Sequence, residues 1–201
     1  MYSQKHEDDI IKKLIPKNNG YFVDIGACDA KWISNSRYFA EIGWKILMLE
    51  MNPFNLCNLL KEYQGNSNIE IMSTAILEDT QEKIVKGYLT EGDAISTLFP
   101  HWKEKWEKKN AVYKYNNFSV NGITCTDLAK YIKTKTDTVD VVSIDVEGNS
   151  HKIGMNMVDV LDAKCYIVEH DDKIQELRQK FESLNYTYIT HTTVNIIFVK
   201  K

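Results

Sequence analysis

Acidic residues stand at the ends of four short apolar runs of the sequence. The first run ends in Asp24 and leads into Gly26, and the second ends in Glu50. Two later runs end in Asp145-Val146-Glu147 and in Glu169-His170. Because the carboxyl ends of parallel strands meet at one edge of a sheet, we expect these side chains to surround one crevice.

The first two runs favour a nucleoside site. Gly26 permits a tight turn and lets a ligand approach the main chain. Glu50 can accept hydrogen bonds from both ribose hydroxyls of a nucleoside cofactor. The alternative is an ordinary turn beside a solvated Glu50. Cys28 and Ala30 replace later glycines of a dinucleotide-binding loop, so S-adenosylmethionine (SAM), which has no phosphate, fits better than NAD.

The later two runs concentrate negative charge. Four carboxyl groups at one sheet edge make each of them harder to ionise unless a cation balances them. The sulfonium of SAM or a divalent metal would do so, and oxygen ligands suit Mg²⁺ or Mn²⁺. The alternative is a structural role, in which Asp145 or Asp171 stabilises the start of a helix.

The pattern of apolar residues predicts the elements that carry these groups. We expect strands at residues 21–25, 45–50, 69–72, 139–144 and 165–169, and a terminal hairpin at 186–189 and 194–199. Helical spacing or capping predicts helices at 6–15, 34–42, 53–63, 128–132 and 172–184, with residues 149–157 unassigned. Ser34 is expected to start the second helix, and Thr124 or Thr126 the fourth. Strands that alternate with helices predict an α/β fold with a mostly parallel sheet and helices on both faces.

Length and composition limit the class of protein. The 201 residues suit a single domain, residues 1–201. A net charge of −3 argues against a dedicated nucleic-acid binder. No apolar run is long enough to span a membrane, and no signal peptide is visible. With four scattered cysteines, these features predict a cytoplasmic protein.

Several motifs, taken in order, resemble the FkbM family of SAM-dependent methyltransferases. The resemblance spans residues 3–76 and 124–198. Its motifs are Ser3-Gln4 with Glu7-Asp8, Phe22-Val23-Asp24-Ile25-Gly26-Ala27, Ser34-Asn35-Ser36, Gly43-Trp44, Glu50-Met51-Asn52-Pro53, Ile144-Asp145-Val146-Glu147-Gly148, Glu169-His170 and Asn195-Ile196-Ile197-Phe198.

This resemblance implies a Rossmann-like class I methyltransferase fold, with a seven-stranded sheet that ends in an antiparallel hairpin. It implies methyl transfer from SAM to a hydroxyl oxygen of a sugar or glycan. The alternatives are a non-sugar acceptor of polyketide type, a nucleotide-binding oxidoreductase, and a non-catalytic nucleotide-binding module. The residues expected to bind the cofactor are Gln4, Asp8, Asp24, Gly26, Ala27, Ser34, Asn35, Glu50, Met51, Asn52, Thr74, Asp145 and Val146.

The acceptor hydroxyl must lose a proton. His170 is the expected general base, together with Asp145, since histidine titrates near neutrality; the alternative is a structural histidine. A competing route is a Mg²⁺ or Mn²⁺ site formed by Asp145, Glu169 and His170, with Asp171 as an alternative to His170.

Residues 77–123 do not resemble the family and are predicted to form an acceptor-binding insertion or lid. Glu147, Trp102 and Trp106 are the expected acceptor contacts, because aromatic faces stack on sugars. The two tryptophans are also four residues apart, which equally describes a helix packed in the core. The expected partners are a small-molecule or glycan acceptor, with a homodimer as a candidate assembly.

Overall fold

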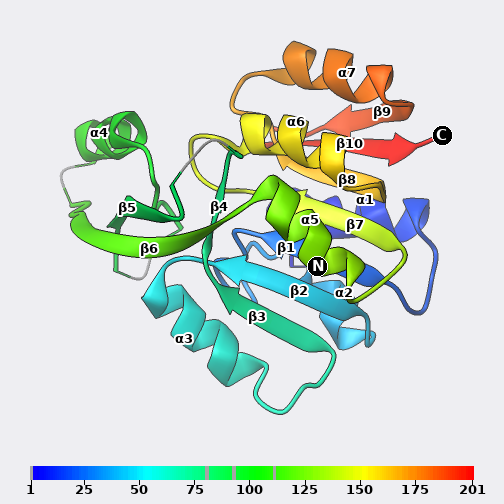
Figure 1. Ribbon diagram of the computed structural model, residues 1–201, viewed down its shortest axis with the longest axis horizontal. Coiled ribbons are helices and arrows are strands. Elements are labelled where there is room, and N and C mark those ends of the chain that lie inside the picture. The colour runs from blue at the N-terminus through cyan, green and yellow to red at the C-terminus, as the bar shows by residue number, and fades with distance from the viewer. Residues whose placement is uncertain (1, 80–81, 92–93, 111) are drawn as a thin grey trace.

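The structure is a computed structural model that describes residues 2–79, 82–91, 94–110 and 112–201. Its main sheet has seven strands in the order β3-β2-β1-β7-β8-β10-β9 (Figure 1). These strands are β1 (Tyr21–Ile25), β2 (Lys45–Glu50), β3 (Ile69–Ser73), β7 (Val139–Ile144), β8 (Ala163–Glu169), β9 (Tyr186–His191) and β10 (Asn195–Lys200).

The pairing within this sheet confirms the predicted fold. β3, β2, β1, β7 and β8 pair in parallel, whereas β10 pairs antiparallel with both β8 and β9. β1, β2, β7 and β8 are mostly buried and apolar, as strands covered on both faces must be, whereas β3 at the edge of the sheet is only partly buried. The structure is therefore α/β, with the predicted antiparallel hairpin at its C-terminal end.

Helices cover both faces of the sheet and form two apolar cores. One core lies under α5 (Cys125–Lys133), α6 (Ser150–Val160) and α7 (Ile174–Ser183). The other lies under α1 (Glu7–Leu14), α2 (Arg37–Glu41) and α3 (Pro53–Glu62). Successive residues of β1 alternate between the two cores, because side chains of a strand point to opposite faces.

The chain between β3 and α5 builds a smaller unit beside the main sheet (Figure 1). It has a three-stranded sheet in the order β4-β6-β5 and the helix α4 (Pro100–Lys109). The strands are β4 (Ala75–Leu77), β5 (Ile84–Leu89) and β6 (Asn116–Thr124). This unit covers the predicted insertion at 77–123, of which residues 80–81, 92–93 and 111 lie outside the described residues.

Two details of the helices differ from the sequence expectation. Ser34 does not start α2: the helix begins after Ser36, and the Ser34 hydroxyl accepts a hydrogen bond from the Arg37 N–H at 3.2 Å. The unassigned segment 149–157 lies mostly within α6. Of the two candidate caps, Thr124 is the one that begins α5, and its side chain accepts from the Asp127 N–H.

Strand register brings the predicted site residues to one edge. Ile25 pairs with Leu49 on one side and with Ile144 on the other. Ile144 in turn pairs with Val168. The residues that come next in each strand therefore lie side by side at the carboxyl edge of the sheet.

Candidate active site

A cavity of about 430 Å³ opens at this edge of the sheet. Most of the predicted site residues line it, from the main sheet, the N-terminal segment and α4. The predicted residues in its wall are Gln4, Asp24, Gly26, Ala27, Ser34, Asn35, Glu50, Met51, Thr74, Trp102, Trp106, Asp145, Val146, Glu147, Glu169 and His170. Among the described residues that line the cavity, the predicted Asp8 and Asn52 are absent.

The loop after β1 is built around Gly26. Its φ is +85°, and a Cβ atom placed there would lie 1.8 Å from the Asp145 carbonyl oxygen. The main-chain N–H groups of Gly26 and Ala27 both donate to the Leu49 carbonyl at 3.0 Å. Only glycine fits this position, because the ends of β1 and β7 approach so closely.

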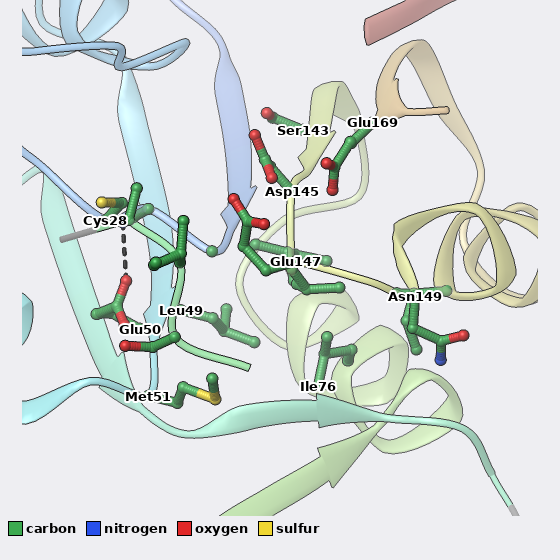
Figure 2. Close-up of a pocket in the computed structure, with 18 of the residues that line it drawn as sticks. Cys28, Leu49, Glu50, Met51, Ile76, Ser143, Asp145, Glu147, Asn149 and Glu169 are labelled. Atoms are coloured by element: carbon green, nitrogen blue, oxygen red, sulfur yellow. Dashed lines mark hydrogen bonds between the residues drawn. The ribbon is translucent and has the colours of Figure 1, made fainter. Parts of the chain in front are cut away.

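Glu50 points into the cavity from the end of β2 and holds the first loop in place (Figure 2). Its Oε2 accepts from the Cys28 N–H at 2.8 Å, and its Oε1 accepts from the Asn52 N–H at 2.6 Å. Burial raises the pKa of Glu50 to about 7, against the lowering effect of these hydrogen bonds. Each carboxylate oxygen can accept a further hydrogen bond, so both can serve a ribose hydroxyl.

Asp24 is buried beneath the same cavity. Its Oδ2 accepts from the Ser36 hydroxyl at 2.5 Å, and burial raises its pKa to about 6. Nearby, the Asn35 amide donates to the Ser143 hydroxyl at 3.0 Å, while the Asn35 Oδ1 is buried with no partner among the described residues. An unpaired buried acceptor in a cavity wall is a ready site for a ligand N–H or O–H.

Asn52 and Asp8 have structural positions behind the wall. Asn52 begins α3, where its Oδ1 accepts from the Phe54 N–H, and its amide donates to the Thr90 carbonyl and the Ser96 hydroxyl. Asp8 accepts from the Ser3 hydroxyl and the Tyr2 N–H. Burial raises the pKa of Asp8, but these bonds outweigh it and the net shift is downward.

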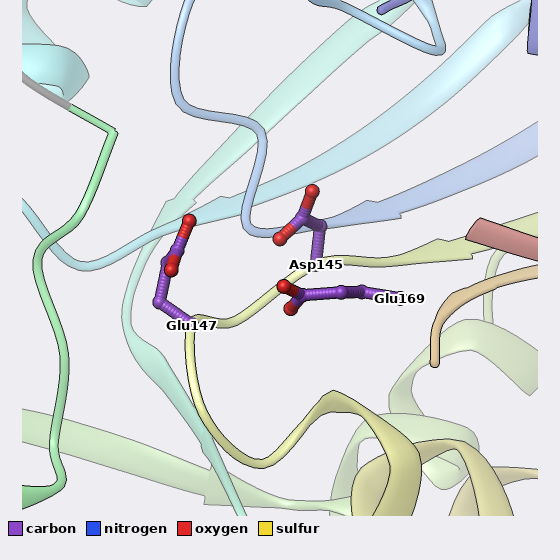
Figure 3. A group of neighbouring side chains, drawn as sticks. All are labelled: Asp145, Glu147 and Glu169. Atoms are coloured by element: carbon purple, nitrogen blue, oxygen red, sulfur yellow. The ribbon is translucent and has the colours of Figure 1, made fainter. Parts of the chain in front are cut away.

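Three carboxyl groups converge beyond the ends of β7 and β8 (Figure 3). Asp145, Glu147 and Glu169 each offer a carboxylate oxygen, and these three oxygens all lie within 4.8 Å of one another. Burial, followed by the charge of Glu147, raises the pKa of Asp145 to about 7. Burial, followed by the charge of Glu169, raises the pKa of Glu147 to about 8. The pKa of Glu169 is raised for the same two reasons, with Asp145 as the neighbouring charge. The group can therefore hold and release protons near neutral pH.

His170 follows Glu169 and is buried in the cavity wall. Its Nδ1 accepts from the Asp172 N–H at 3.1 Å. A neutral histidine that accepts at Nδ1 carries its proton on Nε2, which here has no partner among the described residues. In this arrangement the Nε2 of His170 is the ring atom left for contact with a bound molecule.

The tryptophans of α4, Trp102 and Trp106, line the cavity. None of the residues of α4, all within the described part of the chain, is buried, so the alternative of a core helix is wrong. The Trp102 Nε1–H donates to the Glu147 Oε2 at 2.7 Å, and the Thr97 hydroxyl donates to the Glu147 carbonyl at 2.6 Å. The insertion is thus hydrogen-bonded directly to Glu147.

Several cavity residues were missed by sequence reasoning. Cys28 holds Glu50 through its main-chain N–H, which no side-chain pattern reveals. Asn55 and Lys105 also line the cavity. The spacing between Trp102 and Lys105 on one helix was the available signal, since residues three apart share a face.

Comparison with known proteins identifies the family. The family model described as "Methyltransferase FkbM domain" matches residues 24–188. The chain belongs to the FkbM methyltransferase family. Its activity is methyl transfer with SAM as the donor, as the resemblance implied. A comparison of this FkbM methyltransferase with curated proteins found no match.

Solved structures show the same fold at low identity. A putative rRNA-methylase from Clostridium thermocellum is 10% identical with a TM-score of 0.56, and 100% of this chain and 96% of that chain are covered. The Methanococcus jannaschii fibrillarin pre-rRNA processing protein is 12% identical with a TM-score of 0.50, over 92% and 67% of the two chains. M. capricolum TrmK, solved with S-adenosyl-homocysteine (SAH), is 12% identical with a TM-score of 0.50, over 98% and 68%. These likenesses show the class I methyltransferase fold alone.

The residues of the cavity fit SAM. The Asn35 Oδ1 is a buried acceptor without a partner among the described residues, and Glu50 retains free lone pairs. The cavity is lined by seven carboxyl groups and one lysine, Lys105. Such a wall favours a ligand that carries positive charge, as SAM does at its sulfonium and ammonium groups.

No helix in the part of the chain that the structure describes combines the length and the apolar character needed to cross a bilayer.

Proposed function

We propose that this FkbM methyltransferase transfers the methyl group of SAM to a hydroxyl oxygen of a sugar or glycan. The observation that supports it is the composition of the cavity. Trp102 and Trp106 line it from α4, and the three carboxyl groups Asp145, Glu147 and Glu169 line it from the strand ends. Indole rings stack on the C–H faces of sugars, and carboxylates accept hydrogen bonds from several hydroxyls at once.

SAM supplies an electrophilic methyl group, and the protein positions the acceptor and removes its proton. We assign the role of general base, which accepts the proton of the acceptor hydroxyl, to Asp145 or Glu147. Their raised pKa values keep them able to exchange a proton near neutral pH. We prefer these carboxyl groups to His170, the base that the sequence suggested, because the His170 Nδ1 already accepts from the Asp172 N–H.

A second candidate mechanism uses a divalent cation. The oxygens of Asp145, Glu147 and Glu169 are close enough to share one ion, and three oxygen donors suit Mg²⁺ or Mn²⁺. In this version Glu147 takes the place that the sequence gave to His170. A bound cation would lower the pKa of the acceptor hydroxyl, and the carboxylates would hold the ion.

The experiment is a labelled methyl-transfer assay. Purified protein is incubated with SAM and separate panels of oligosaccharides, sugar nucleotides and phenolic or polyketide-type alcohols, each with EDTA, Mg²⁺ or Mn²⁺. Methylated sugar supports the proposal, and its dependence on the added ion separates the two mechanisms. Turnover of the non-sugar panel alone contradicts the sugar assignment. SAM binding without turnover of any acceptor favours the non-catalytic alternative.

A matched pair of variants locates the acceptor. We expect Trp106→Leu to raise the KM for the sugar about fivefold and leave the affinity for SAM unchanged, since stacking on one ring is worth about 1 kcal/mol. The control is Trp32→Leu, because Trp32 is 77% exposed and does not line the described cavity. Equal effects of the two substitutions would contradict an acceptor platform on α4.

A further inference from the structure

The residues before α1 contribute to the wall of the cavity. Gln4 is exposed and lines the cavity wall. Two residues earlier, the Tyr2 carbonyl accepts from the Ser34 N–H at 3.1 Å, and Ser34 is itself in the wall. We call residues 2–6 the strap. The position of Gln4 over the cavity depends on how the two ends of the strap are held.

The end of the strap next to α1 is held by buried acids. Glu7 is fully buried, and its Oε1 accepts from the Asn195 amide at 3.0 Å and from the Thr192 hydroxyl at 3.2 Å. Its Oε2 accepts from the Lys5 N–H at 2.8 Å. Asp8 accepts from the Tyr2 N–H and the Ser3 hydroxyl, which folds the strap back onto the start of the helix. This end is therefore part of the folded core.

At the other end of the strap, the Tyr2 side chain is held by Glu41 and by Arg37, one of two arginines in the chain. The Tyr2 hydroxyl donates to both oxygens of Glu41 at 2.8 Å, and the Arg37 Nε–H donates to the Glu41 Oε1 at 3.0 Å. The Arg37 Nη1–H donates to the Glu62 Oε1 at 2.7 Å. The guanidinium also lies 5.7 Å from the centres of the Tyr2 and Tyr63 rings.

Arginine is suited to this position in a way that lysine is not. Its planar group donates in two directions at once and stacks on aromatic rings, so it can bind two carboxylates and two tyrosines together. The Arg37 side chain is 16% exposed, and its partner Glu41 is 40% exposed. Arg37 thus connects the strap, α2 and α3.

We propose that Arg37 is a positioning residue for the cofactor: it holds Tyr2, and through Tyr2 it keeps Gln4 over the SAM cavity. The residue does not line the cavity, so it acts through the strap. The inference rests on SAM binding, which the family establishes, and is independent of the sugar acceptor in the proposed function.

The test measures the affinity for SAH by titration calorimetry and the amide hydrogen exchange of residues 3–6. We expect Arg37→Ala to weaken SAH binding about tenfold and to speed exchange in the strap. Arg37→Lys should fall between, because one ammonium group cannot replace the fork. Tyr2→Phe removes only the hydroxyl that reaches Glu41, and it should weaken binding several-fold with the fold intact.

Arg178→Ala is the matched control. Arg178 also pairs with a glutamate four residues along its helix, Glu182, and lies over a tyrosine ring, Tyr188, but on α7. We expect no change in SAH affinity. A faster-exchanging strap with unchanged SAH affinity in both Arg37→Ala and Tyr2→Phe would overturn the proposal. Absence of SAH binding by the wild-type protein would instead contradict the cofactor assignment, so the two failures are distinguishable.

Discussion

Gly26 and Asp145 come closer together than a side chain at position 26 would permit. The loop after β1 and the end of β7 pass each other with the Asp145 carbonyl oxygen where a Cβ atom would stand. Gly43 makes a useful comparison. Its φ of +86° is the same within a degree, but nothing lies within 4 Å of its Cβ position.

We expect Gly26→Ala to lower the free energy of unfolding by more than 3 kcal/mol or to prevent folding, because strain and a main-chain clash act together. Gly43→Ala should cost about 1 kcal/mol, from the left-handed conformation alone. Denaturant unfolding of the two variants measures the difference. Similar losses for both would show that the backbone conformation, and not the contact with Asp145, makes Gly26 necessary.

His170 shows the limit of residue-level prediction. The sequence placed it correctly at the end of a strand and in the cavity wall. It could not show that the next turn aims the Asp172 N–H at Nδ1, at 3.1 Å. That contact depends on Asp171 and Asp172, both with positive φ, and no spacing rule predicts this pair.

The helix α4 is joined to the active site by one indole and not by the other. The Trp102 Nε1–H donates to Glu147, whereas the Trp106 Nε1–H is buried with no partner among the described residues. Substitution of either tryptophan by phenylalanine removes a similar volume. The difference between the two variants therefore isolates the hydrogen bond that joins the insertion to β7.

We expect Trp102→Phe to be less stable than Trp106→Phe by about 1 kcal/mol at pH 7, the usual net contribution of a hydrogen bond. Trp102→Phe should also raise the KM of the acceptor, because α4 is no longer fixed to Glu147. Thermal unfolding and steady-state kinetics measure the two effects. Equal stability of the variants would mean that the Trp102 bond contributes nothing to holding α4.

The main sheet and α3 could be predicted because the strands are strongly apolar and the helix has a clear start. β1, β2 and β7 are buried runs, and Asn52-Pro53 is a clear helix start. The insertion could not be predicted in the same way. β5 and β6 are partly exposed, and their residues alternate too weakly to indicate which face is covered. Residues 149–157 were missed as α6 because no side-chain cap marks the start of that helix.

The charge of the whole cavity sets the pH dependence of stability. Glu147 has an ordinary pKa of 4.5 and a pKa of about 8 in the folded protein. Between these values the folded protein holds a proton that the unfolded chain has lost. The free energy of unfolding therefore falls as pH rises through this window, and it levels off above it.

In the presence of EDTA and the absence of SAM, we expect Glu147→Gln to reduce the fall in the free energy of unfolding as pH rises. The Tm of the variant relative to the wild type should rise by about 3 °C between pH 5 and pH 8.5, since ~1 kcal/mol shifts the Tm of a chain this size by roughly 2–4 °C. Glutamine keeps an acceptor for Trp102. Differential scanning fluorimetry across the pH range makes the measurement.

Glu176→Gln is the control for this experiment. Glu176 is on α7, and its hydrogen bond from Lys173 lowers its pKa. A lowered pKa adds stability above the ordinary value and loses it as pH falls, so this variant should gain nothing as pH rises. A Tm difference for Glu147→Gln that does not vary with pH would contradict the raised pKa.

The contacts around Gly26 also bear on the entropy of cofactor binding. The Asp145 N–H donates to the Ile25 carbonyl at 2.9 Å, and Gly26 and Ala27 donate to the Leu49 carbonyl. Three strand ends are thereby joined through the main chain before any ligand arrives. Such a loop loses little conformational freedom when SAM binds, so more of the contact energy is kept as affinity. The part of the cavity beside Gly26 is therefore preorganised for the methyl donor.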